Sequence, residues 1–405
     1  MAYSIRALSV KSPGDAEREL AAINIDPFGI RNMGPKMLHR LLLIERIGSG
    51  EAAILKKELL SLGGDVAVAG GRSGRAHAET SVILMGTIKQ LRSLCTKLLK
   101  QTFGLPSLAT DILRLLDREA ASTCFWEIGG RSLDISRRAC IMGILNVTPD
   151  SFSDGSRFFT PERAVERAFE MEEEGADIID IGGESTRPYA HPVGPDEELR
   201  RVMPVLEGLA GKLRIPVSID TFKSAVAKEA LATGVEIVND ISALTFDDRM
   251  AEVVSSAHAG LVLMHTRGRP ADMQKDTAYP SIVSEVTDSL RKSLALAAEA
   301  GIEQQRIVID PGIGFGKSAE GSLEILRRLS EFSALGRPVM VGTSRKSFIG
   351  AVLGRSEGER VFGTAATVTV ALANGASIFR VHDVREMRDT VDMAMALMKP
   401  SAGTI

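Results

Sequence analysis

The sequence predicts an α/β protein whose main part is a (β/α)8 barrel, the TIM-barrel architecture, preceded by a smaller α/β module. From residue 140 onward, short apolar strands alternate with amphipathic helices, which is typical of parallel strands joined by crossover helices. Eight of these strands end in polar residues, near Asn146, Asp180, Asp220, Asp240, His265, Asp310, Ser344 and His382. Because such barrels carry their active sites at the carboxyl ends of the strands, we expect one shared site there.

A doubly wound open sheet is the alternative fold for the same alternation. That fold concentrates its chemistry at one switch point in the strand order. It would not explain polar motifs at all eight strand ends, so the barrel is favoured.

The composition is that of an ordinary soluble protein. The chain has 405 residues and a formal net charge of -3, which allows a large core and gives no sign of nucleic-acid binding. The three cysteines have neither metal-ligand spacing nor the pattern of a disulfide framework. No signal peptide and no membrane-spanning apolar run are evident. We therefore expect a cytoplasmic protein with no nucleic-acid or membrane partner.

Residues 1–122 are predicted to form the N-terminal module, whose role the sequence does not reveal. We expect helices at 38–45, 51–62 and 88–100, and strands at 66–69 and 81–85. The module contains no catalytic constellation, and its paired lysines are better explained as solvated helix faces than as binding patches.

Residues 123–400 are predicted to form the barrel, which begins with a β-hairpin. Residues 125–135 alternate around Gly129-Gly130, a hairpin signal, and such a hairpin would close the bottom of the barrel around Trp126 as a packing residue. Helices are expected at 161–174, 197–212, 222–233, 282–300 and 321–333. Pro161 fits a first helical turn because it has no N–H to leave unpaired.

Two types of strand end suggest different ligands. The side-chain oxygen of Asn146 would suit Mg²⁺, with water and a phosphate completing the shell, although an isolated Asn more often forms a turn. Asp220 and Asp310 would accept N–H bonds from a planar heterocycle and stabilise positive charge on it. Capping of the following helix is a serious alternative for Asp220. Asn239 would offer both a donor and an acceptor to a ring edge, and Asp240 would orient its loop.

The loop after Asp310 is rich in glycine but lacks the spacing of a nucleotide P-loop. Its glycines would let the backbone approach a flat ligand, with Phe315 as a wall. Met264 is either a pocket wall or a core residue.

Cations follow the last strands. Lys346, Arg380 and His382 would form a diphosphate cradle together with Asn146. Arg380 and His382 are two residues apart, so both can face the same site. The sequence shows no nucleophile set and no zinc-ligand spacing. The chemistry expected is therefore positioning, and stabilisation of an anionic leaving group.

Five motifs taken together resemble dihydropteroate synthase over about residues 125–400. They are 146–155 (NVTPDSFSDG), 182–188 (GGESTRP), 310–312 (DPG), 344–347 (SRKS) and 380–383 (RVHD). The resemblance implies condensation of (7,8-dihydropterin-6-yl)methyl diphosphate with 4-aminobenzoate, which gives 7,8-dihydropteroate for folate biosynthesis and releases diphosphate. It also implies Mg²⁺ as cofactor, departure of diphosphate before the arylamine attacks a pterin-methyl cation, sensitivity to sulfonamides, and a homodimer.

The resemblance implies a function for thirteen residues. Those for the pterin are Asp220, Asn239, Met264, Asp310, Phe315 and Lys346. Those for diphosphate are Asn146, Arg380 and His382, with the metal at Asn146. Those for 4-aminobenzoate are Phe152, Thr186, Arg187 and Ser347, on two loops. Asp220, Lys346 and Asn146 would be catalytic, Asp220 by offsetting the charge of the cation.

The sequence departs from the family pattern at two loop positions. The family usually has glycine at the position of Tyr189 and often has glycine at the position of Ser156. We therefore expect this chain to differ from the family in loop closure and in its response to sulfonamides.

Two other functions would explain part of this pattern. A methyltetrahydrofolate-dependent methyltransferase would explain Asp220, Asn239 and Asp310 but not the diphosphate cradle. A catalytically silent barrel that acts as an assembly partner would be expected to have lost site residues, and none is missing.

Overall fold

The computed structural model describes residues 3–69, 79–102, 104–120, 124–148, 160–187 and 190–398. The chain divides into two compact units, residues 1–122 and 123–405. Each unit has a hydrophobic core of its own.

The first unit is built on a three-stranded antiparallel sheet with the order β1 (His39–Gly48), β3 (Glu79–Thr87), β2 (Asp65–Val68). Its helices are α1 (Pro13–Ala22), α2 (Pro27–Met37), α3 (Ser49–Leu60), α4 (Ile88–Leu98) and α5 (Leu105–Ala120). Leucines of α3 and α4, among them Leu55 and Leu94, share a buried cluster with Val82 and Leu84 of β3. The helices expected at 51–62 and 88–100 and both expected strands are confirmed.

The helix expected at 38–45 is wrong, because this segment forms most of β1. Leu41 pairs with Met85 and Leu43 with Ile83 in the antiparallel ladder with β3. Leu41 and Leu43 are 66% and 52% exposed, whereas Leu42 and Ile44 pack against the core. Leucine favours helices in isolation, but this alternation buries one face of a strand, and the sheet contacts override the local preference.

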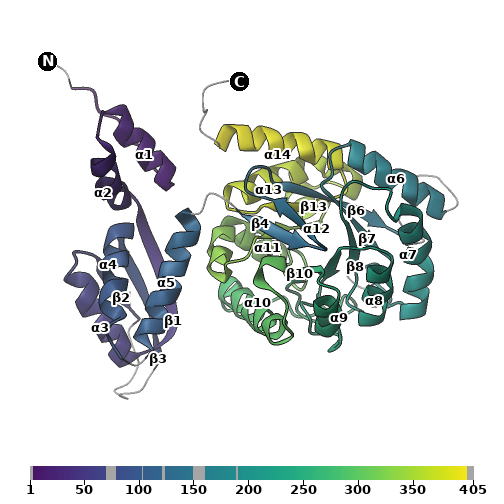
Figure 1. Cartoon of the computed structure of the whole chain (residues 1–405), viewed down its shortest axis with the longest axis horizontal. Coiled ribbons are helices and arrows are strands. Elements are labelled where there is room, and N and C mark those ends of the chain that lie inside the picture. The colour runs from purple at the N-terminus through teal and green to yellow at the C-terminus, as the bar shows by residue number, and fades with distance from the viewer. Residues whose placement is uncertain are drawn as a thin grey trace. The chain divides into compact units, whose positions relative to one another are not determined.

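The second unit is a closed barrel of parallel strands (Figure 1). The strands are β6 (Cys140–Asn146), β7 (Ile178–Gly182), β8 (Val217–Asp220), β9 (Ile237–Asp240), β10 (Gly260–Met264), β11 (Ile307–Asp310), β12 (Met340–Val341) and β13 (Ile378–Val381). Their order is β11-β10-β9-β8-β7-β6-β13-β12, and a parallel bridge from Ile309 to Val339 joins the two ends. The predicted (β/α)8 architecture is confirmed.

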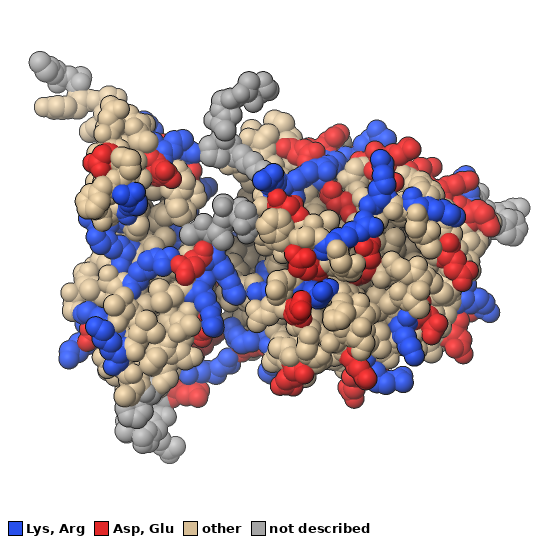
Figure 2. Space-filling view, in the orientation of Figure 1, with Lys and Arg blue, Asp and Glu red and all other residues tan. Residues whose placement is uncertain are grey.

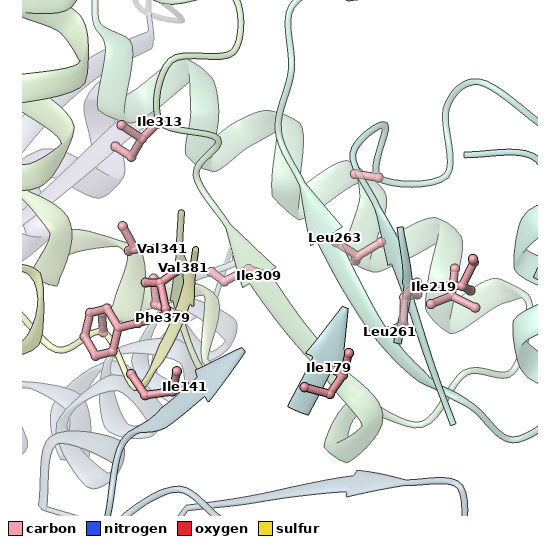
Figure 3. Close-up of a cluster of buried hydrophobic side chains, with 14 of the residues drawn as sticks. Ile141, Ile179, Ile219, Leu261, Leu263, Ile309, Ile313, Val341, Phe379 and Val381 are labelled. Carbon is pink, nitrogen blue, oxygen red and sulfur yellow. The ribbon is translucent and has the colours of Figure 1, made fainter. Parts of the chain in front are cut away.

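Helices surround the barrel and bury the outward side chains of its strands. They are α6 (Pro161–Glu173), α7 (Pro195–Leu209), α8 (Ser224–Ala232), α9 (Met250–Ser256), α10 (Ile282–Glu299), α11 (Ala319–Arg327), α12 (Ser347–Leu353), α13 (Val361–Ala373) and α14 (Val384–Met398), with short 3-10 turns η1 (Gln304–Arg306), η2 (Leu329–Leu335) and η3 (Glu357–Glu359). Figure 3 shows part of the resulting core, including Ile141, Ile179 and Ile219 on neighbouring strands.

The hairpin of β4 (Phe125–Ile128) and β5 (Arg131–Asp134) closes the amino-terminal end of the barrel, as predicted. Trp126 and Ile128 are fully buried and share a cluster with the first inward side chains of the strands, which are Met142, Ile178, Ile237, Val262, Val308, Met340 and Ile378. Nε1 of Trp126 donates to the carbonyl oxygen of Arg306 at 2.8 Å. Trp126 is therefore a packing residue, as expected.

Charged side chains of both signs are intermixed over the barrel face shown in Figure 2. Within the described ranges, the helices are too short or too polar to span a lipid bilayer.

Candidate active site

The side chains inside the barrel change from apolar to largely polar over two residues along the strands, towards their carboxyl ends. Side chains two residues apart on a strand point to the same side of the sheet. On five strands, the residue two positions after the apolar layer that the hairpin closes therefore also points into the barrel. These residues are Asp180, Asn239, Met264, Asp310 and Arg380. The strands thus carry these side chains towards the carboxyl end of the barrel.

A pocket opens at this end. It is lined by Ile144, Thr186, Asp220, Asn239, Ile241, Met264, Asp310, Phe315, Met340, Gly342, Ser344, Lys346, Arg380 and His382. Every residue predicted to hold the pterin is in this set, as are Arg380 and His382, which were predicted for diphosphate, and Thr186. Met264, left open between pocket wall and core, is a pocket wall.

The remaining predicted residues are placed differently. Asn146 ends β6 beside the pocket, because a Cβ at Gly182 would lie 3.7 Å from its Oδ1 and 3.5 Å from the Cβ of Asp220. Arg187 pairs with Glu357 at 2.7 Å. Ser347 follows Lys346 and begins α12. Phe152, Ser156 and Tyr189 lie outside the described residues.

Asp220 is not a helix cap. The amide of Ser224, at the start of α8, donates to Oδ2 of Asp247 at 2.8 Å instead. Asp220 accepts from Nη2 of Arg380 at Oδ2, over 2.6 Å, and its buried Oδ1 has no protein hydrogen-bond partner among the described residues. Burial raises the pKa of Asp220 to about 7, although Arg380 opposes this shift. The helix-capping alternative is therefore excluded.

Arg380 lies between two carboxylates. Its Nε donates to Oδ2 of Asp180 at 2.6 Å, and its Nη2 reaches Asp220. Burial opposes its charge, but Asp180 and Asp220 raise the pKa of Arg380 above its ordinary value. The guanidinium stays ionised at the base of the pocket.

Asn239 is oriented by the same carboxylate. Its Nδ2 donates to Oδ2 of Asp180 at 3.0 Å, and its buried Oδ1 has no protein partner in the described part of the chain. Asn239 pairs with Asp220 across β8 and β9. The pocket therefore presents two unpaired acceptor oxygens from adjacent strands.

Asp310 and Lys346 form the opposite wall. Oδ1 of Asp310 accepts from the amide of Gly312 at 2.7 Å, and burial raises the pKa of this carboxyl. Nζ of Lys346 donates to the carbonyl oxygen of Ile313 and lies 4.3 Å from the centre of the Phe315 ring. Burial lowers the pKa of Lys346 to about 8, against the attraction of Asp310. This wall combines a donor with an acceptor.

The glycine-rich loop is tight for a reason that the sequence did not show. Gly312 has φ of 70°, and a Cβ there would lie 1.9 Å from the carbonyl oxygen of His265. A Cβ at Gly316 would lie 2.9 Å from the carbonyl oxygen of Arg267. The glycines therefore let the loop pack against the chain after β10 and so fix Phe315 as a pocket wall.

His382 is held by a neighbouring strand end. Its Nδ1 lies 2.9 Å from Oγ of Ser344. Burial, followed by the nearby Arg380, lowers the pKa of His382 to about 3. The ring is therefore neutral at ordinary pH, so any contact it makes with a ligand would be a hydrogen bond and not an ion pair.

Six residues that build the site have no function predicted from the sequence. Ile144, Ile241, Met340, Gly342 and Ser344 line the pocket, and Asp180 holds two of its lining residues. Asp180 had a usable signal, since it is the one charged residue in the apolar run 178–182. Its alternation with Ile178 also places it inside the barrel.

Comparison with known proteins agrees with this geometry. A family model described as pterin binding enzyme matches residues 142–382. A dihydropteroate synthase of Synechocystis sp. is 45% identical over 273 residues, which cover 67% of this chain and 94% of that protein. The chain belongs to the dihydropteroate synthase family of pterin-binding enzymes. The members of this family are transferases of folate biosynthesis.

A solved dihydropteroate synthase of Xanthomonas albilineans, described with 4-aminobenzoic acid, is 41% identical with a TM-score of 0.64, and the match covers 69% of this chain and 99% of that one. A probable bifunctional folylpolyglutamate synthase/dihydropteroate synthase of Halobacterium salinarum is 42% identical over 390 residues, covering 96% of this chain and 46% of that protein. The chain therefore spans about half the length of such bifunctional relatives, and the match extends into the N-terminal unit.

Proposed function

We propose that this chain condenses (7,8-dihydropterin-6-yl)methyl diphosphate with 4-aminobenzoate, giving 7,8-dihydropteroate and diphosphate. The proposal rests mainly on two buried oxygens beside Asp310, Oδ1 of Asp220 and Oδ1 of Asn239, which have no hydrogen-bond partner among the residues that the structure describes. Unpaired buried acceptors favour a ligand with several N–H donors on one edge, as a pterin has. A methyltransferase would use the same acceptors but would not need both Arg380 and His382.

The pterin ring would lie between Met264 and Phe315. Asp220, Asn239 and Asp310 would accept from its nitrogen-bound hydrogens, and Lys346 would donate to it. Arg380 on β13 and His382 directly after it would bind the diphosphate on the methyl side. Thr186, Arg187, Ser347 and Phe152 would border the 4-aminobenzoate, Thr186 within the pocket lining and the others outside it.

The reaction proposed is a substitution at the pterin methyl carbon. The C–O bond breaks first, and diphosphate leaves with the electron pair. The amine nitrogen of 4-aminobenzoate then attacks the pterin-methyl cation and forms a C–N bond, after which that nitrogen loses a proton. Asp220 lowers the barrier because its negative charge faces a ring that becomes positive in the transition state.

Magnesium fits the residues beside the pocket only together with the substrate. The described residues contain no group of three or more His, Cys, Asp or Glu side chains that would hold a metal by themselves. Asn146 supplies one amide oxygen, which is separated from Asp220 by Gly182 of the intervening strand, and Mg²⁺ commonly completes its shell with water and substrate phosphate. Bound there, Mg²⁺ would neutralise charge on the leaving diphosphate. A homodimer and a cytoplasmic location remain predictions.

The test is dihydropteroate formation from the two substrates, with Mg²⁺ or with excess chelator, for wild type and three variants. We expect Mg²⁺-dependent product from wild type, little from Asp220→Asn, and a raised Mg²⁺ requirement for Asn146→Ala. Asp248→Asn, an exposed acidic position, serves as the matched control and should match wild type. Folded wild type that makes no product would refute the proposal, and methyl transfer from methyltetrahydrofolate would be assayed next.

A further inference from the structure

Asp180 serves the pocket without lining it. Its side chain is fully buried in the middle of β7. A single oxygen, Oδ2, accepts from Nε of Arg380 at 2.6 Å and from Nδ2 of Asn239 at 3.0 Å. Both donors belong to residues that do line the pocket. Asp180 is thus the shared support of two side chains predicted to touch substrate.

Asp180 and Asp220 both pair with Arg380, and these three groups determine the net charge at the base of the pocket. Arg380 contacts Asp180 and Asp220 at 2.6 Å each. Two carboxylates and one guanidinium carry a net charge of -1 when all are ionised. Without Asp180, Arg380 and Asp220 would form a neutral pair, and Asp220 would offset less of a positive charge on the ligand.

The same carboxylate determines which atom of Asn239 faces the ligand. Because Nδ2 is bound to Asp180, Oδ1 is the atom left to the pocket. Oδ1 of Asp220 lies on the adjacent strand and is also without a protein partner in the described ranges. The arrangement offers two neighbouring acceptors to a cationic, N–H-rich ring.

We propose that Asp180 is a positioning residue, which keeps the base of the pocket anionic during diphosphate departure and turns the Asn239 carbonyl towards the pterin. This inference rests on the proposed function. It adds Asp180, in the middle of β7, to the residues that serve the site.

The effect of the Asp180 charge can be measured in the pH–rate profile, which a purely structural role of Asp180 would not shift. The charged groups that act on Asp220 are Arg380, Asp180, Glu198, Asp240 and Lys346. Burial is the main cause of the raised pKa of Asp220, and the negative charge of Asp180 adds to it. Removing that charge leaves Arg380 paired with Asp220 alone. The pKa of Asp220 then falls, and the acid limb of the pH–rate profile moves to lower pH.

Asp180→Asn tests the charge, because asparagine keeps an acceptor oxygen for Arg380 and Asn239. We expect kcat to fall by about 10- to 100-fold, with the affinity for pteroic acid, measured by calorimetry, changed far less. Asp180→Ser removes the charge and also shortens the side chain that holds Arg380 and Asn239. We therefore expect it to weaken pteroic acid binding as well as lower kcat. If Asp180→Asn does not fold, Asp180→Ser is judged by the same kcat and pH criteria.

Asp177→Asn is the matched control. Asp177 directly precedes β7, and its Oδ2 accepts from Nη1 of Arg388 at 3.2 Å and from the amide of Ile141 at 2.8 Å, away from the pocket lining. We expect this variant to keep the wild-type kcat and pH profile even if its melting temperature drops.

Two results would overturn the inference while leaving the proposed function intact. One is that wild type is active and Asp180→Asn has the same kcat and the same acid limb of the pH–rate profile as wild type. The other is an equal loss of kcat and melting temperature in Asp180→Asn and Asp177→Asn. A wild type that makes no dihydropteroate would overturn the proposed function and this inference together.

Discussion

Nζ of Lys317 lies 2.8 Å from Nδ1 of His265 in the interior of the barrel unit, and neither side chain lines the pocket. Lys317 also donates to the carbonyl oxygens of Phe315 at 2.9 Å and of His265 at 3.3 Å. Burial lowers the pKa of both side chains well below the ordinary values. Lys317 therefore fastens the glycine-rich loop, and with it Phe315, to the chain that follows β10.

Replacing Lys317 by methionine should loosen this loop. The variant removes the Lys317 donor from the carbonyl oxygens of His265 and Phe315, so we expect the free energy of unfolding to fall by about 1–3 kcal/mol and the affinity for pteroic acid to weaken. Urea denaturation and calorimetry measure the two effects. Lys228→Met, at an exposed position of α8, should show neither, and equal midpoints for the two variants would contradict the assignment.

The rate should depend on the protonation of Asp220. Because burial raises its pKa to about 7 and the anion is the active form, kcat/KM for the pterin substrate should fall as the pH drops below that value. Lys346, with a pKa of about 8, adds a fall on the alkaline side. His382, whose pKa is about 3, does not titrate in this range. A profile that is flat between about pH 5 and 9 would rule out both assignments.

The same shift of Asp220 affects stability. A carboxyl that binds its proton more tightly when folded makes folding less favourable as the pH rises from its unfolded pKa of 3.8 towards 7. Asp220→Asn should therefore flatten this part of the stability curve, measured by urea denaturation at several pH values. An unchanged slope would mean that Asp220 titrates normally.

The hairpin at the bottom of the barrel leaves no room at Gly260. A Cβ at this position would lie 2.4 Å from Cγ2 of Ile128, a fully buried β-branched residue. Gly260→Ala should cost about 1–3 kcal/mol of unfolding free energy, because the hairpin must shift. Gly358→Ala, where the added methyl group meets nothing within 4 Å, is the control. Equal urea midpoints for the two variants would show that the hairpin adapts without cost.

Glu357 should compete with 4-aminobenzoate for Arg187. The two side chains are 2.7 Å apart and 47% and 69% exposed, so their pairing is weak. Glu357→Gln should lower KM for 4-aminobenzoate by up to about 5-fold, which corresponds to roughly 1 kcal/mol. Glu320→Gln, which removes another exposed carboxylate paired with arginine, should not change this KM. A raised KM in Glu357→Gln would mean that Glu357 orients Arg187 productively.

The barrel could be predicted from the sequence because strand alternation and polar strand ends are local signals. The same signals placed Asp220, Asn239 and Asp310 together, since the carboxyl ends of parallel strands meet at one edge. Local signals failed where partners are distant. Asp180 was seen as a strand end but given no function, because Arg380 lies 200 residues further along the chain.

The error at β1 has a similar cause. A run of leucines is compatible with either a helix or a strand, and its pairing with β3 decides between them. The reason for the glycines after Asp310 was likewise hidden, because the carbonyl oxygen that Gly312 approaches belongs to His265, on a different strand connection.

The close approach of Gly312 to His265 bears on how readily this protein would acquire resistance to an inhibitor. A compound that lies against the backbone of residues 311–316 meets a surface that few substitutions can reshape, because any side chain at Gly312 would collide with a carbonyl oxygen 1.9 Å away. Arg187, by contrast, is 69% exposed and pairs with the exposed Glu357, so a change there disturbs little of the core. Escape mutations should therefore arise more easily against ligands of the 4-aminobenzoate loops than against ligands of the pterin cradle.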